Sequence, residues 1–163
     1  DLRLDPYTRR ARRISIRDER NGDAVVSIIE IVSHGNKASH AHAEQFLTKS
    51  LAFLDRGIHL LVVDVQPPTR CVPAGFHPQV CEAHGQPAPV VPADRPLSAV
   101  SYQWLGANGV RAHIVALKVG DALPDMPIFL EPHRFVRAPL EPTYTEAFQS
   151  VPWKFREMVE SGG

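Results

Sequence analysis

Two acidic residues interrupt apolar runs that are long enough to form buried strands. Glu30 lies within the run Ile28–Val32, and Asp64 lies near the end of the run Ile58–Val65. An unpaired charge in such surroundings is strongly destabilising, so each carboxylate needs a compensating cation or metal ion. A carboxylate in an apolar sheet is also a place where a shifted pKa and acid–base or metal chemistry are expected.

Several polar residues stand where they could act together with Glu30. Arg13 can form a structural ion pair with it, which requires no chemistry. Lys49, at the edge of a predicted helix stripe, can instead stabilise developing charge, and Lys37 in the turn after the core strand competes for that role. Ser33, at the strand end, either orients a water or phosphate oxygen or caps a turn.

Histidines and cysteines offer metal binding as a second kind of chemistry. His34, His40 and His42 flank the loop that leaves the core strand, and with Glu30 they could hold a divalent ion. Four further potential ligands lie in the proline-rich stretch 66–96: Cys71, His77, Cys81 and His84. Their spacing fits no standard zinc knuckle, so zinc is not expected, and a thiol pair with loop histidines is favoured.

The elements that must position Glu30 and Asp64 are a strand, a helix and a strand. Val25–Val32 is a β-branched run of strand length, and Ile58–Val65 is a second buried strand. Between them Ser39 can cap a helix that Gly57 ends. Small or apolar residues recur in it at helical spacing: Ala43, Phe46, Leu47, Ser50, Leu51 and Leu54. The sequence predicts a parallel, right-handed β-α-β crossover.

A hairpin is predicted before the crossover. Asn21-Gly22 is a two-residue turn signal that joins Ile14–Asp18, a short strand, antiparallel to the core strand. With this turn, Arg13 lies opposite Glu30, and Asp18 pairs with Val25 and points to the other face. A one-residue bulge would change this register.

The remaining chain predicts an extended sheet and a closing helix. Residues 66–96 hold eight of the fifteen prolines and show no periodicity, which predicts a long loop that is either functional or disordered. The later elements are expected in this order: a hairpin of Leu97–Leu105 and Val110–Val119 that extends the sheet, a short edge strand Met126–Leu130, and a helix Tyr144–Glu160 with a break allowed at Pro152.

Length and composition place the chain among single-domain proteins. Its 163 residues are enough to bury a real core, and we expect one domain over 1–163. The absence of a long apolar window or charged leader, and the presence of only two cysteines, favour a cytoplasmic protein without membrane contact. The chain begins at Asp1, so we expect a fragment that lacks an N-terminal region.

Charge is balanced over the whole chain but not at its beginning. Lysines and arginines number 18, as do acids, so no global field attracts nucleic acid. The first twenty residues nevertheless hold seven arginines against four acids. This arginine-rich arm is suited to phosphate contacts through four of its members: Arg9, Arg10, Arg12 and Arg13.

Four stretches of the chain resemble an uncharacterised bacterial family that is known only as a domain of unknown function. The family pattern reads VEIRD, VVTVIEILSPANK, GVHLVEIDL and LPxIPIPL. The corresponding stretches here are ISIRD (Ile14–Asp18), AVVSIIEIVSHGNK (Ala24–Lys37), RGIHLLVVDV (Arg56–Val65) and LPDMPIFL (Leu123–Leu130). The resemblance covers most of the chain, and its most specific part is the crossover.

The same crossover looks like the PD-(D/E)xK restriction-endonuclease-like superfamily. The resemblance implies an α/β fold in which a mixed sheet carries a restriction-endonuclease-like core. It also implies that Glu30 is a magnesium ligand, Ser33 the strand-end serine and Lys49 a lysine displaced onto the helix. In such sites one or two metal ions polarise the phosphodiester and activate water, while the lysine stabilises developing charge.

The chain departs from this pattern at its second acid. Ser15 stands where the family has glutamate, which weakens the implied metal site. His34 replaces the proline of the family's turn and could supply a ligand instead. Asp18 or Asp23 could serve only in another register. The expected metal ligands are therefore Glu30, His34 and Asp18.

Two functions from different classes follow from these observations. The first is a magnesium-dependent nuclease that hydrolyses phosphodiester bonds of DNA or RNA, with Glu30 and Lys49 at its centre. The second is an inactive binding module in which Arg13 neutralises Glu30 and the arginine-rich arm contacts nucleic acid or a protein partner. Zinc binding by the proline-rich stretch is a third option, and the sequence does not indicate an oligomeric state.

Overall fold

The computed structural model describes residues 13–160, except for the side chains of residues 158 and 159. Its strands and α-helices follow in this order: β1 (Arg13–Asp18), β2 (Ala24–Ile31), α1 (His40–Asp55), β3 (His59–Asp64), α2 (His77–Ala83), β4 (Leu97–Trp104), β5 (Val110–Leu117), β6 (Asp125–Glu131), β7 (Arg134–Pro139), α3 (Leu140–Ser150) and α4 (Trp153–Glu160). Three 3-10 helices join them: η2 (Glu19–Asn21), η3 (His34–Lys37) and η4 (Gly106–Asn108).

A five-stranded mixed sheet forms the centre of the fold, in the order β1-β2-β3-β4-β5. Strands β2 and β3 are parallel and are joined by α1, whereas the other neighbours are antiparallel. The predicted β-α-β crossover in a mixed α/β sheet is therefore confirmed. The predicted extension of the sheet by β4 and β5 is confirmed as well.

Helix α1 begins and ends where its sequence predicts. The hydroxyl of Ser39 accepts a hydrogen bond from the His42 amide at 3.2 Å, which satisfies one donor of the first turn. Gly57 adopts a φ of +77°, and a Cβ there would lie 3.4 Å from the Trp104 ring. The predicted stripe lies on the sheet, because its members Ala43, Phe46, Ser50 and Leu54 are buried.

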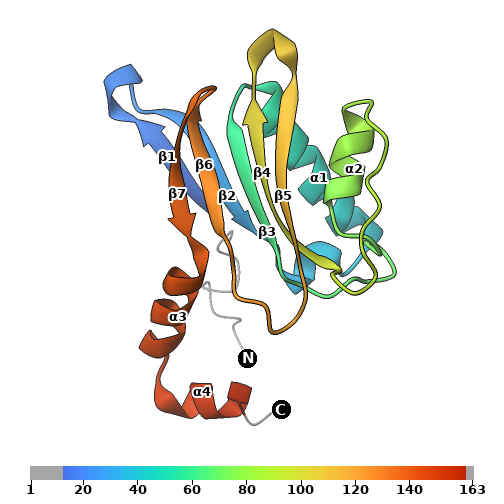
Figure 1. The fold of residues 1–163 in the computed structure, drawn as a ribbon, viewed down its shortest axis with the longest axis vertical. Helices are drawn as coiled ribbons and strands as arrows, with labels where there is room; N and C mark the ends of the chain where they lie inside the picture. Colours follow the sequence, from blue (N-terminus) through green and yellow to red (C-terminus); the bar gives the residue numbers. More distant parts are fainter. Residues whose placement is uncertain (1–12, 161–163) are drawn as a thin grey trace, which may run out of the picture.

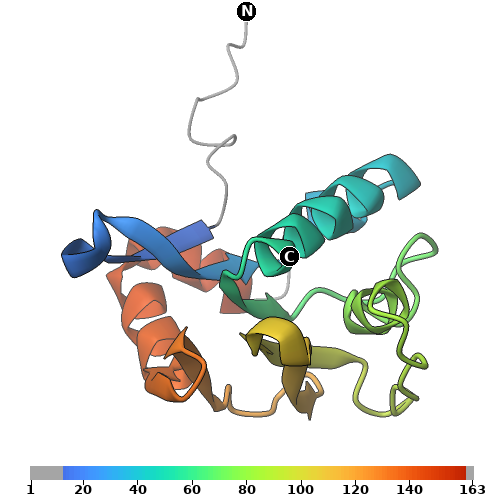
Figure 2. The same cartoon turned by 90° about the horizontal axis from the view of Figure 1, so that it is seen from above.

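The two faces of the sheet are covered by different elements, as Figures 1 and 2 show: α1 and α2 on one face, and the β6–β7 hairpin on the other. The helix side buries residues of β2, β3 and both helices, including Ile28, Leu60, Phe46 and Phe76. The hairpin side buries the alternate residues Leu61 and Val63 of β3, together with Met126 and Ile128 of β6.

The turn between β1 and β2 is longer than predicted. Residues 19–23 form it, as η2 followed by Gly22 and Asp23, whose φ angles are +63° and +61°. Arg13 still lies opposite Glu30, because a register shift after Ile16 compensates for the longer turn. The predicted pairing of Asp18 with Val25 is wrong, since Asp18 pairs with Ala24.

The proline-rich stretch and the C-terminal third contain elements that the sequence did not predict. Helix α2 lies within residues 66–96, and its neighbours Val72 and Phe76 are part of the core on that side. Strand β6 was expected as an edge of one sheet, but it pairs with β7 in a separate two-stranded sheet. The closing helix divides into α3 and α4 around Pro152, as predicted. None of the helices in residues 13–160 is long and apolar enough to cross a membrane.

Candidate functional site

Glu30 lies on the helix side of β2 and contacts two cations. Its Oε1 atom is 2.6 Å from Arg13 Nε, across the hairpin, and 3.1 Å from Lys49 Nζ, on α1. The side chain of Glu30 is 4% exposed, whereas Arg13 and Lys49 are 29% and 32% exposed. The carboxylate is therefore buried beneath two basic groups that reach solvent.

Aromatic rings of α1 support both cations. The Arg13 guanidinium carbon lies 4.8 Å from the Phe53 ring centroid, and Lys49 Nζ lies 5.3 Å from that of Phe46. Both distances are within cation–π range. The rings and Glu30 together hold the two basic groups on one surface.

Glu30 offers a magnesium ion one carboxylate, and the Oε1 atom of that carboxylate already contacts two cations. Mg²⁺ is bound by oxygen ligands in near-octahedral geometry, with one or two carboxylates supplied by the protein. Here the carboxylate oxygen faces two cations, and Ser15, which is not an acid, lies opposite Ile28 on the neighbouring strand. Within residues 13–160 no three histidine, cysteine or acidic side chains converge as a metal site would require.

The other expected metal ligands and Ser33 lie apart from Glu30 or have structural roles. Asp18 accepts a hydrogen bond from the Arg20 amide at 3.0 Å. It is five residues from Arg13 along β1, or about 17 Å. His34 is exposed in η3. Ser33 caps η3 in a capping box with Asn36, so the structure shows the turn-capping role.

Lys37, the competing candidate, contacts the other buried carboxylate. Its Nζ atom lies 2.6 Å from Asp64 Oδ1 and donates to the Gln66 carbonyl at 2.7 Å. Both side chains are almost completely buried, with 1% and 4% of their surface exposed. Gly75, with a φ of +73°, approaches from the other side, and a Cβ there would lie 3.3 Å from Asp64 Oδ2.

Burial determines the titration of Asp64. Desolvation raises its pKa above the ordinary value of 3.8, and it outweighs the hydrogen bond and charge of Lys37, which lower that pKa. Backbone hydrogen bonds at Gln66 and Phe76 also favour the charged form. The pair is enclosed in the interior, so we assign Lys37 and Asp64 a structural role at the carboxyl ends of β2 and β3.

Two of the four potential zinc ligands, His77 and Cys81 of α2, form a hydrogen-bonded group with Tyr102 of β4. His77 Nδ1 lies 2.8 Å from the Tyr102 hydroxyl, and its Nε2 lies 3.5 Å from Cys81 Sγ. Burial, with a smaller contribution from Glu82, raises the pKa of Cys81, and burial lowers the pKa of His77. A raised pKa favours the neutral thiol, which is the poor metal ligand.

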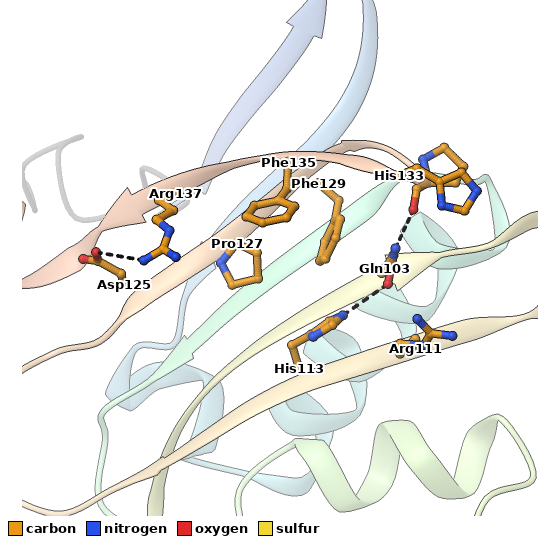
Figure 3. Close-up of a pocket in the computed structure, with 10 residues that line it drawn as sticks. Gln103, Arg111, His113, Asp125, Pro127, Phe129, His133, Phe135 and Arg137 are labelled. Atoms are coloured by element: carbon orange, nitrogen blue, oxygen red, sulfur yellow. Dashed lines mark hydrogen bonds and ion pairs between the residues drawn. The ribbon is translucent and has the colours of Figure 1, made fainter.

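A groove on the hairpin side brings together residues that the sequence interpretation did not single out. It is an open cavity of about 500 Å³ between β4–β5 and the outer face of the β6–β7 hairpin. Its lining is Gln103, Arg111, His113, Asp125, Pro127, Phe129, Pro132, His133, Phe135 and Arg137. Figure 3 shows Phe129 and Phe135 between Arg137 at one end and His133 at the other. The segment RFVRAP shows no alternation that would have predicted β7, and the groove itself depends on how two sheets meet.

Comparison with protein-family profiles, with curated proteins and with solved structures finds no match to this chain.

Proposed function

We propose that this chain is a nucleic-acid-binding module on a restriction-endonuclease-like core, in which Arg13, Lys49 and the arginine-rich arm contact phosphates. The observation that carries the proposal is that Glu30 is shared by two cations on a single oxygen. A carboxylate used in this way holds basic side chains in position.

The charge balance of this group favours an anionic partner. Two cations and one carboxylate leave a net charge of +1, and the negative charge is the buried member. A phosphate approaching from solvent therefore meets Arg13 and Lys49 before Glu30. Arginine is well suited to this contact, since its planar guanidinium binds phosphate oxygens in pairs.

The arginine-rich arm adds three cations that precede Arg13 in the sequence. Arg9, Arg10 and Arg12 lie outside the described residues, and Arg12 directly precedes Arg13. Each phosphate that a cation neutralises releases counterions, so affinity falls steeply as salt rises. Binding through the arm and the Arg13–Lys49 surface should therefore be strong at low salt and insensitive to base sequence.

The first test is a Glu30→Gln variant in duplex DNA binding, measured by fluorescence anisotropy with a labelled 20-base-pair duplex. The substitution removes the shared negative charge but keeps the side-chain size and an oxygen that can still accept hydrogen bonds from Arg13 and Lys49. The two cations therefore stay in place, and affinity should rise about three- to tenfold at 50 mM KCl and less at 200 mM. Glu44→Gln is the matched control, because Glu44 is an exposed acid on α1, the helix that carries Lys49. An equal gain in both variants, or no duplex binding by the parent chain, would refute the proposed surface.

Phosphodiester hydrolysis is a second candidate, and the 3.1 Å contact between Lys49 Nζ and Glu30 Oε1 favours it. Those two residues are the glutamate and displaced lysine that the resemblance implies. A nicking assay on supercoiled DNA with Mg²⁺ or Mn²⁺ separates the candidates. Cleavage by the parent chain that disappears in Glu30→Gln would support hydrolysis, whereas tighter binding by that variant without cleavage supports the binding module.

A further inference from the structure

We infer that the groove between β5 and the β6–β7 hairpin binds single-stranded nucleic acid by stacking bases on Phe135. This site lies on the hairpin side of the five-stranded sheet, whereas α1, which carries Lys49 and contacts Arg13 through Phe53, lies on the opposite side. It is thus a second contact surface that does not depend on the first.

Aromatic side chains form the floor of the groove. Phe129 is 5% exposed and is enclosed by His113 and Phe135, with ring centroids 5.1 and 5.7 Å away. Phe135 leans on Phe129 but is itself 51% exposed. A rigid, half-exposed ring on a packed base is a stacking platform, because every nucleobase presents a π-face.

The charges at the rim favour a phosphate chain over an uncharged aromatic ligand. Arg111 of β5 and Arg137 of β7 line the groove, and its one acid, Asp125, lies 3.9 Å from Arg137. No ion pair involves Arg111 within residues 13–160. Arg137 is two residues from Phe135 along β7, about 7 Å, so a base on Phe135 places its phosphate within reach of that guanidinium.

The polar groups at the inner end of the groove are already paired. Gln103 donates from Nε2 to the Pro132 carbonyl, and its Oε1 lies 3.1 Å from His113 Nε2 (Figure 3). A buried amide with both ends occupied is not available to read the edge of a base. The groove is therefore expected to accept any base, with affinity set by stacking and charge.

The test compares three variants of β7 in binding a fluorescein-labelled (dT)12 strand at 50 mM KCl. Phe135→Ala should weaken binding about tenfold, which is the scale of one lost base stack. Phe135→Leu keeps apolar packing on Phe129 but removes the aromatic ring, and should lose most of the same affinity. Val136→Ala is the matched control, because Val136 is 48% exposed but points to the other face of the hairpin.

Competition distinguishes stacking from simple charge attraction. AMP should displace (dT)12 at lower concentration than ribose 5-phosphate in the parent chain, and this difference should disappear in Phe135→Ala. Three results would each overturn the inference. The two competitors could displace (dT)12 equally well, Phe135→Ala and Val136→Ala could lose the same affinity for (dT)12, or the parent chain could fail to bind (dT)12.

The same assay with duplex DNA separates this inference from the proposed function. Duplex bases are stacked on each other and cannot reach Phe135, so Phe135→Ala should leave duplex binding unchanged. If (dT)12 binding depends on Phe135 but the duplex does not bind, the groove stands and the Arg13–Lys49 surface fails. If the duplex binds through Arg13 and (dT)12 binding does not change in Phe135→Ala, the Arg13–Lys49 surface stands and the groove fails.

Discussion

Replacing Lys37 with methionine is expected to lower the free energy of unfolding by about 3–5 kcal/mol at pH 8. The variant keeps the length of the side chain and removes its charge, so the Asp64 carboxylate remains buried without its cation, 2.6 Å from where Nζ had been. The Gln66 carbonyl also loses its donor. Urea denaturation followed by circular dichroism measures the change.

The loss should be smaller at pH 5 than at pH 8. Burial already raises the pKa of Asp64 above 3.8, and removing Lys37 removes two influences that lower it. For an acid with a raised pKa, the folded state binds more protons than the unfolded state in the window above 3.8, so stability falls as pH rises through that window. In Lys37→Met the pKa of Asp64 is raised further, because Lys37 no longer lowers it. The window therefore extends to higher pH, where the carboxyl of the folded variant is still protonated.

Two control substitutions test whether the lost ion pair causes the loss of stability. Lys118→Met removes an exposed lysine and should change stability by no more than about 0.5 kcal/mol. Adding Asp64→Asn to Lys37→Met removes the unpaired charge and should recover part of the loss, most clearly at pH 8. A loss that is independent of pH and not recovered by Asp64→Asn would mean that packing of the Lys37 chain, and not the ion pair, carries the effect.

The double substitution Arg13→Ala and Lys49→Ala is expected to cost about 3–5 kcal/mol, more than the sum of the two single effects. Either cation alone still compensates Glu30, so each single variant should cost about 1 kcal/mol, close to the value for half-exposed pairs. When both are removed, a carboxylate that is 4% exposed is left without a partner.

Adding Glu30→Gln to this double variant should restore stability, because the unpaired charge is then absent. The denaturation curves of the parent chain, the two single variants and the double variant form a double-mutant cycle. This cycle gives the coupling free energy between Arg13 and Lys49 directly. Additive single effects, or no recovery with Glu30→Gln, would show that Glu30 does not depend on the two cations. The same variants should bind duplex DNA more weakly than the parent chain, so stability and binding are tested on one set of proteins.

Local patterns predicted the crossover, and they also placed Arg13 opposite Glu30. Helix α1 has a Ser39 cap, an apolar stripe and a final glycine within one continuous segment, and each signal acts over a few residues. The Arg13–Glu30 opposition followed from the turn position, although the turn has five residues instead of two. That prediction was confirmed because the register shift after Ile16 offset the longer turn.

Long-range packing decided most of what local patterns did not predict. Helix α2 is short and lies among prolines, so it has no readable period, and burial of Val80 and Phe76 against the core stabilises it. Lys37 forms its ion pair with Asp64 because of the path that the loop after β2 takes. No spacing in the sequence distinguishes Asp64 from Glu30 as the partner of that lysine.

The sequence by itself determined the mixed α/β class, the β-α-β unit and the burial of two carboxylates, because strand and helix periods are set by neighbouring residues. Only the tertiary structure decided that β6 and β7 form their own sheet, that Phe129 and Phe135 face Arg111 across a groove, and that Asp18 lies far from Glu30. These features depend on which faces of elements distant in sequence pack against each other. Such packing is a property of the whole chain, because the free energy gained by one pair of faces must exceed that of every alternative pairing.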